Sequence, residues 1–323
     1  MGSALGSSLS RASSETLRGL LRRVTTRPLV HWVDARDGEG ATALHAAASG
    51  GRAEFCAWLL EQGRFTEVDR QDDKGQTALH HAAREGHGAA CLALLDAVRP
   101  GRLGLSSWTF GPATAKDADG RTALHAVAEG GSAEACQALL GHRRLAGLVR
   151  QADDGGWTPL HCAARAGNTE VCRVLLHSVS PMRGLLEVKD GEGRTALHLA
   201  AAADRPQTCV VLLDCYAAGH VGTGELGNFL RMAYFTIAAD PAKEGTERQG
   251  ANSRDRQGRT ALHLAARAGA ASACQALVRH TAFDALAATD QRGRTAADIA
   301  TGKARRLLKQ AAVEMRAFQR DWC

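Results

Sequence analysis

The sequence predicts an all-α protein built as a solenoid of stacked repeats. The string Thr-Ala/Pro-Leu-His occurs six times, and a degenerate seventh copy follows at 295–298. Other residues keep fixed distances from each Thr, which is typical of a repeated structural unit. Aromatic residues make up only 4% of the chain, so we expect a core of closely packed, Ala- and Leu-rich helices. A single repeat is too small to bury its own apolar face, and neighbouring repeats must therefore stack.

A turn precedes each copy of the string. An Asp lies five positions before the Thr, and a Gly lies two positions before it, in all seven copies. Asp bonds its own backbone and Gly relieves backbone strain, so this spacing predicts a tight turn. The Thr residues are Thr42, Thr77, Thr122, Thr158, Thr195, Thr260 and Thr295.

Two helices are predicted after each turn. Thr is a favourable N-cap, and Pro159 occupies a first helical position where its missing N–H costs nothing. In five copies a Gly nine positions after the Thr predicts the break between the helices. A Leu pair seventeen and eighteen positions after the Thr, as in Leu59-Leu60, belongs to the second helix. The spacing up to this position never changes, so length varies only between the second helix and the next turn.

Two of these connections are long, at 96–116 and 214–254. We predict that both are insertions, and that the second contains a short helix near 226–237. A collapsed repeat is the alternative for the second stretch. With the repeat aligned there, Leu230 and Ala233 keep their register, but the Asp, Gly, Thr, His and Cys positions all fail.

The repeat resembles the ankyrin repeat, whose T-P-L-H-x-A signature recurs at a period of 33. The resemblance covers 34–310 and implies about six full repeats with degenerate capping units at the ends. It also implies a non-catalytic scaffold that binds partners through its turns and first helices. The usual Gly-Ala-Asp-Val-Asn stretch after the second helix is absent.

The ends of the chain are predicted to be simpler. We expect a flexible N-terminus at 1–13, a capping helix region at 14–33 and a helical tail at 311–323. Residues 1–27 carry five Arg and one acidic residue, so a targeting signal is an alternative interpretation of this segment. The basic C-terminal stretch likewise leaves open a nuclear-import or nucleic-acid patch beside its capping role.

In each of the six full copies, a His lies three positions after the Thr. Equivalent residues of stacked repeats lie ~8–10 Å apart, whereas zinc ligands each lie ~2 Å from one ion. The resemblance implies instead that each His bonds the Thr of its own repeat and the neighbouring turn. We therefore expect no metal and no cofactor. The six residues are His45, His80, His125, His161, His198 and His263.

A second ladder consists of six of the nine Cys residues, fourteen positions after the Thr. Buried free Cys behaves as a small hydrophobe, and stacked repeats hold the ladder wider than the ~7 Å that a disulfide spans. Buried thiols predict a reducing compartment, the cytoplasm or the nucleus. No phosphate loop, Cys-x-x-Cys pair or nucleophile elbow occurs, so we expect no enzyme; a site within 214–254 is the remaining enzymatic alternative.

The net charge of +6 favours an anionic partner. The resemblance implies an inner surface formed by five positions of each repeat: six, four, three and one before the Thr, and seven after it. Cations outnumber anions there by fourteen to six. We predict that an acidic segment of a protein partner binds along this basic concave groove, and that Trp157, Arg194 and Arg259 face solvent. Nucleic acid or anionic lipid on the same face is the alternative. The predicted partner-binding residues are Arg121, Trp157, Arg194, Arg259, Arg294, Arg84, Arg165 and Arg267.

Overall fold

The computed structural model describes residues 35–61, 69–97, 114–178, 183–218, 250–280 and 285–321. Within these ranges the chain forms helices and turns, with one isolated β-bridge and no strand. The all-α prediction is confirmed. The chain divides into an N-terminal unit, 1–155, and a C-terminal unit, 156–323. The predicted N-terminal segments and the helix at 226–237 lie outside the described residues.

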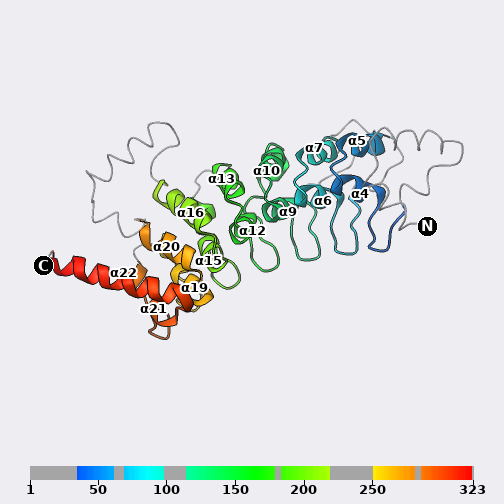
Figure 1. Ribbon diagram of the computed structural model, residues 1–323. Coiled ribbons are helices and arrows are strands. Elements are labelled where there is room, and N and C mark those ends of the chain that lie inside the picture. Colours follow the sequence, from blue (N-terminus) through cyan, green and yellow to red (C-terminus); the bar gives the residue numbers. More distant parts are fainter. Residues whose placement is uncertain are drawn as a thin grey trace, which may run out of the picture. The chain divides into compact units, whose positions relative to one another are not determined.

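The N-terminal unit consists of paired helices in two layers (Figure 1). Its first helices are α4 (Ala43–Ser49), α6 (Ala78–Arg84) and α9 (Ala123–Gly130), and its second helices are α5 (Ala53–Glu61), α7 (Gly88–Ala97) and α10 (Ala133–Leu140). Helix α6 packs between α4 and α9, while α7 packs between α5 and α10. A short helix, α11 (Arg143–Ala146), follows in the connection. Like helices therefore stack on like helices, as the repeat predicts.

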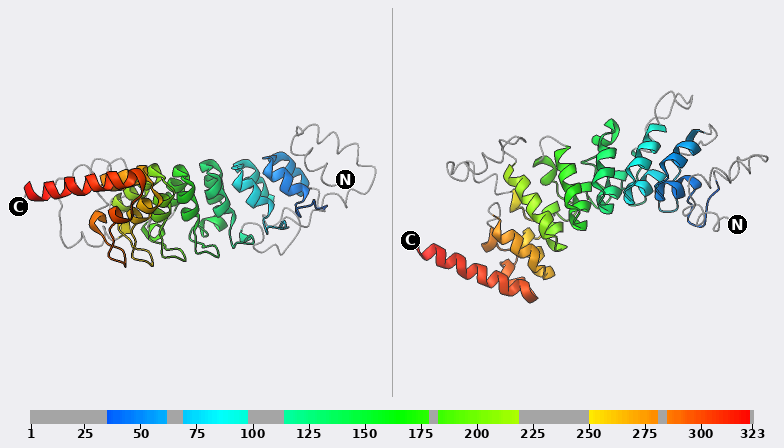
Figure 2. Two further views of the ribbon diagram at one scale, coloured as in Figure 1. Left: turned by 60° about the horizontal axis from the view of Figure 1, so that its bottom comes forward. Right: turned by 45° about the horizontal axis from the view of Figure 1, so that its top comes forward.

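The C-terminal unit has the same two layers, seen from two further sides in Figure 2. Its first helices are α12 (Pro159–Ala166), α15 (Ala196–Ala202), α19 (Ala261–Ala268) and α21 (Ala296–Ile299), and its second helices are α13 (Thr169–His177), α16 (Pro206–Ala218), α20 (Ala271–Arg279) and α22 (Gly302–Asp321). Short helices α14 (Arg183–Leu186) and η1 (Ala285–Ala287) lie in connections. Helix α22 runs without a break through residue 310, so the predicted tail continues the last repeat's helix. No helix among the described residues is long and apolar enough to cross a membrane.

The repeats on either side of the second long connection contact each other directly. Helix α15 packs on α19, and α16 packs on α20. Tyr216, near the end of α16, is buried and donates a hydrogen bond to the Leu186 carbonyl (2.7 Å). Ala251, just after the undescribed part, is buried as well. Both edges of this connection therefore pack on the repeats, while its interior, 219–249, lies outside the described residues.

The break between paired helices requires a left-handed backbone conformation. The Gly nine positions after the Thr has positive φ in each of the five copies that carry it. The fifth copy has Asp204 there, with φ 51°, the single non-Gly residue of positive φ in the described chain. Its Oδ1 accepts a hydrogen bond from the Ala273 N–H (2.8 Å) in the first turn of α20. Asp204 thus supplies a cap to a helix of the following repeat.

The core contains the predicted Ala, Leu and Cys residues. All six ladder cysteines are free thiols with 0% exposure. Burial raises the pKa of the Cys56 and Cys209 thiols to about 12. At neutral pH almost none of a thiol with so high a pKa is ionised to the reactive thiolate, so it reacts slowly. The prediction of buried cysteines is confirmed.

Candidate partner-binding surface

Hydrogen bonds from the His residues join first helices to the turn of the next repeat, as seen for His45, His80, His161, His198 and His263. In His198 the Nδ1 atom accepts a hydrogen bond from the Thr195 backbone N–H (3.2 Å), and Nε2 donates to the Arg259 carbonyl of the next repeat (3.1 Å). His45 makes the same pair of bonds to Thr42 and the Gln76 carbonyl. The structural role predicted for these residues is therefore confirmed. Among the described residues, no three His, Cys, Asp or Glu side chains come close enough together to hold a metal ion.

These hydrogen bonds require neutral imidazole rings. Burial lowers the pKa of His198 to about 4, and it lowers the pKa values of His45, His80 and His263 as well. A proton on Nδ1 would oppose the Thr N–H that donates to it. The His residues consequently serve the fold and are unsuited to proton transfer at neutral pH.

Within each unit the turns lie side by side below the first helices in Figure 1. The backbone N–H of Asp73 donates to the Glu39 carbonyl of the preceding turn (3.1 Å), and the Arg256 N–H donates to the Glu192 carbonyl (3.1 Å). Side chains six positions before the Thr add further links, since Lys189 Nζ donates to the Arg254 carbonyl (2.9 Å). The turns of neighbouring repeats are therefore fixed relative to one another.

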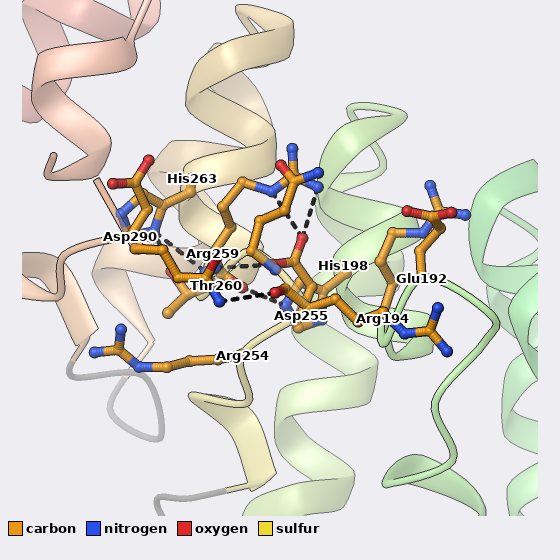
Figure 3. A network of polar contacts seen from close by, with 12 residues as sticks. Glu192, Arg194, His198, Arg254, Asp255, Arg259, Thr260, His263 and Asp290 are labelled. Carbon is orange, nitrogen blue, oxygen red and sulfur yellow. Dashed lines mark hydrogen bonds and ion pairs between the residues drawn. The ribbon is translucent and has the colours of Figure 1, made fainter. Parts of the chain in front are cut away.

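Three of the predicted binding arginines pair with the turn aspartate of their own repeat. Arg259 donates through Nε (2.7 Å) to Oδ2 of Asp255, whose side chain is 0% exposed (Figure 3). Burial alone would raise the pKa of Asp255, but hydrogen bonds from the Arg259 side chain and backbone outweigh it and hold that pKa below its usual value. The equivalent pairs are Arg194 with Asp190 and Arg294 with Asp290, each 2.8 Å from Nη2 to Oδ2.

The prediction that Arg259 faces solvent is wrong. Its side chain is only 10% exposed, compared with 27% for Arg194 and 45% for Arg294. The ion pair with Asp255 holds the guanidinium against the turn, so little of it is left for a partner. Because Asp190 is also fully buried, replacing Arg194 would leave a buried carboxylate without its cation.

Arg121 behaves differently, because its side chain crosses to another turn. Its Nε donates to Oδ2 of Asp153 (3.4 Å), and its Nη1 lies 3.6 Å from Glu129 Oε2. Gln76, one position before an earlier Thr, similarly donates to Oδ2 of Asp117 in the following turn (3.5 Å). A turn aspartate therefore pairs with the side chain one position before a Thr, and this side chain comes either from its own repeat or from the preceding repeat.

Trp157 occupies that position in the fourth copy, where an indole cannot form an ion pair with an aspartate. It lies half-buried beneath two guanidinium groups. The Cζ atom of Arg165 is 5.2 Å from the ring centroid, and that of Arg194 is 5.9 Å from it. Both distances are within the range of cation–π contacts. Three of the predicted residues thus form one cluster, which we call the Trp157 cluster: Trp157, Arg165 and Arg194.

Two of the other predicted residues lie in the last turns of first helices. Arg84 is half-buried in the last turn of α6, and Arg267 is exposed in the last turn of α19. Arg84 and Arg121 belong to the N-terminal unit, and the remaining six predicted residues belong to the C-terminal unit.

Family models match more than half of the chain. A model described as ankyrin repeats in three copies matches 11–102 and 107–184, and a single ankyrin-repeat model matches 192–220 and 257–290. Paired helices, left-handed turns and the Thr–His ladder define a helical-repeat scaffold. The chain belongs to the ankyrin-repeat family. Domains of this family are generally protein–protein interaction modules, and the fold is generally non-catalytic.

Solved structures agree with this assignment of the fold. The ankyrin repeat domain of human ASB11 is 21% identical in sequence, with a TM-score of 0.56, and the match covers 84% of this chain and 98% of that one. The ankyrin repeat domain of Bcl-3, a member of the IkappaB family, is also 21% identical, with a TM-score of 0.57 and coverage of 84% and 99%. No curated protein matches the chain in sequence.

Proposed function

We propose that this protein is a scaffold or adaptor that binds an acidic segment of a partner protein along the basic groove formed by its turns and first helices. The observation that carries the proposal is the Trp157 cluster. Trp and Arg are the residue types most enriched in binding hot spots. An apolar ring and two cations in one place suit a segment that combines an apolar side chain with carboxylates.

The cluster is also well ordered before binding. Asp190 holds the Arg194 guanidinium through its Nε and Nη2 atoms, and the indole supports both guanidinium groups. A side chain that is already fixed loses less conformational entropy when a partner arrives. Arg165, which is exposed, remains able to form two parallel hydrogen bonds with a carboxylate.

An affinity pull-down followed by mass spectrometry tests this proposal. Purified wild-type protein and the Trp157→Ala variant would be incubated with the same cell lysate. We expect at least one partner protein to be retained by the wild type and depleted in the variant. Circular dichroism serves as the control that both proteins are folded. Equal recovery of every partner by the two proteins would contradict the assignment to this cluster.

Nucleic acid or anionic lipid is the second candidate ligand, favoured by the sequence pI of about 9.0. Binding that neutralises many phosphates weakens steeply with salt. A strong salt dependence together with retention of RNA or phosphatidylserine vesicles, and no protein partner, would favour this candidate. The buried thiol ladder supports a reducing compartment in either case.

A further inference from the structure

The charges of the inner positions are distributed unequally between the two units. The five positions of each repeat that form the predicted inner surface carry five cations and five anions in the N-terminal unit, but nine cations and one anion in the C-terminal unit. The cations of the C-terminal unit are Arg165, Lys189, Arg194, Arg254, Arg256, Arg259, Arg267, Arg292 and Arg294, and the anion is Glu192. The anions of the N-terminal unit are Glu39, Asp73, Asp119, Glu129 and Asp154. The basic excess of the predicted groove therefore lies entirely within one unit.

Much of this charge is accessible. Each repeat of the C-terminal unit presents at least one exposed cation, and examples are Arg165, Lys189, Arg256 and Arg292. The turn aspartates Asp190 and Asp255 neutralise Arg194 and Arg259, with which they form ion pairs, so the accessible positive charge comes from the exposed cations at the other inner positions. In the N-terminal unit, by contrast, Glu39, Asp73 and Asp119 are exposed.

We infer that the acidic segment binds the C-terminal unit in an extended conformation and carries an acidic side chain at every third residue. This inference rests on the proposed function. Stacked helices lie about 8–10 Å apart, which is the spacing expected between cations at one position of neighbouring repeats, such as the exposed Lys189 and Arg254. In a polyproline II conformation, an extended peptide advances ~3.1 Å per residue with three residues per turn, so every third side chain faces the same way and three residues span about one repeat. The Trp157 cluster receives the apolar residue at one end of the segment.

An extended peptide suits this surface better than a nucleic acid does. Proteins that bind single strands place successive bases on aromatic side chains. Trp157 is the single aromatic residue at the inner positions of the C-terminal unit. A surface with cations in every repeat but one aromatic ring matches carboxylates along a peptide.

Two synthetic peptides of identical composition test the spacing. The first has twelve residues with Glu at every third position, separated by Ser-Thr pairs, and the second has the same four Glu in one block. Each would be titrated into the full-length protein by calorimetry at fixed salt. We expect the spaced peptide to bind about ten-fold more tightly, because the blocked isomer cannot reach cations of several repeats and each exposed pair contributes little alone.

A pair of matched variants tests the assignment to one unit. Arg292 and Lys74 both lie three positions before the Thr of their repeats, both are exposed, and both backbone amides donate to the turn aspartate. Arg292→Glu in the C-terminal unit should weaken the spaced peptide about ten-fold, whereas Lys74→Glu in the N-terminal unit should leave its affinity unchanged. Equal losses in the two variants would overturn the assignment.

The remaining outcomes separate this inference from the proposed function. If both peptides bind equally and Arg292→Glu weakens both, an acidic ligand is correct but the three-residue spacing is overturned. If neither peptide binds while Trp157→Ala still loses a partner from lysate, the proposed function stands and this inference is overturned. Binding of oligouridylate with no binding of either peptide would overturn both and favour the nucleic-acid alternative.

Discussion

At the scale of single residues, burial decides what the arginine before each Thr does. Arg259 and Arg294 make equivalent ion pairs, but Arg259 is nearly inaccessible and Arg294 is half-exposed. Removing one partner of a buried ion pair leaves an uncompensated charge and costs several kcal/mol, whereas exposed pairs contribute little. We therefore expect Arg259→Ala to lower the free energy of unfolding by about 3 kcal/mol. Arg294→Ala should cost less, because the Arg294 side chain is 45% exposed and water can reach Asp290 once it is removed. Urea denaturation of the two variants measures both, and equal losses would show that burial does not govern these pairs.

The buried His residues predict how stability depends on pH. His198 has a folded pKa of about 4, below the value of about 6.5 for an unfolded chain. Between these values the unfolded state binds a proton that the folded state does not, so stability is fully present above pH ~6.5 and is lost as the pH falls toward 4. NMR titration should find the His198 ring neutral down to about pH 4. A titration near 6.5 in the folded protein would refute the account of the ladder.

The spacing of the turn Asp and the following Arg is visible in the sequence, but on the sequence alone these arginines are assigned to partner binding rather than to ion pairs. Asp255 and Arg259 are four residues apart, as are Asp190 and Arg194. That spacing alone does not say whether the guanidinium turns back onto the turn or projects toward a partner. The answer depends on the burial of Asp255, whose side chain is 0% exposed, and only the packed structure shows this.

At the scale of helices, Asp204 connects two repeats. Asp and Asn tolerate the left-handed conformation better than other non-Gly residues, and a side-chain cap contributes about 1 kcal/mol. Asp204→Ala keeps the strained backbone and loses the bond to Ala273. We expect it to destabilise the protein by roughly 1–2 kcal/mol. Asp204→Gly loses the same bond but relieves the strain, so its loss should be smaller. Thermal melting of both variants provides the comparison, and a larger loss with Gly than with Ala would contradict it.

Helix positions were largely predictable because the Thr, Gly and Leu spacing is constant. The Thr residues begin the first helices as expected, each with the His of its repeat completing a capping box in α4, α6, α9, α12, α15 and α19. The short helices α11 and α14 and the length of α16 were not predicted. They lie where the repeat signature stops, and no fixed spacing marks them.

At the scale of the whole molecule, the buried cysteines predict slow thiol chemistry. Six thiols are fully buried, and burial raises the pKa of most of them to about 12. We expect a thiol reagent to modify these six slowly in the native protein and rapidly after denaturation. Mass spectrometry of the labelled protein identifies the sites. Fast native labelling of most of the ladder would show that the repeats open readily.

The repeat architecture was predictable from the sequence, but the binding surface was predictable only in part. Constant spacing fixes which helices stack, because each repeat contacts its neighbours. The position just before each Thr drew attention to Trp157 and Arg194, which the structure brings together, and their role in binding stays a prediction. The sequence did not distinguish an arginine held by a buried aspartate, such as Arg259, from an exposed one, such as Arg165. Residue type and spacing do not report the burial of a side chain.

The most direct test of the central claim is the affinity of a recovered partner for the Trp157→Ala variant, measured by calorimetry. The account predicts a loss of about 2 kcal/mol of binding free energy, or roughly thirty-fold in Kd, with folding retained. Lys74→Glu, a charge reversal in the N-terminal unit, is the control and should bind normally. Unchanged affinity of folded Trp157→Ala would contradict the claim and place the binding site elsewhere in the chain.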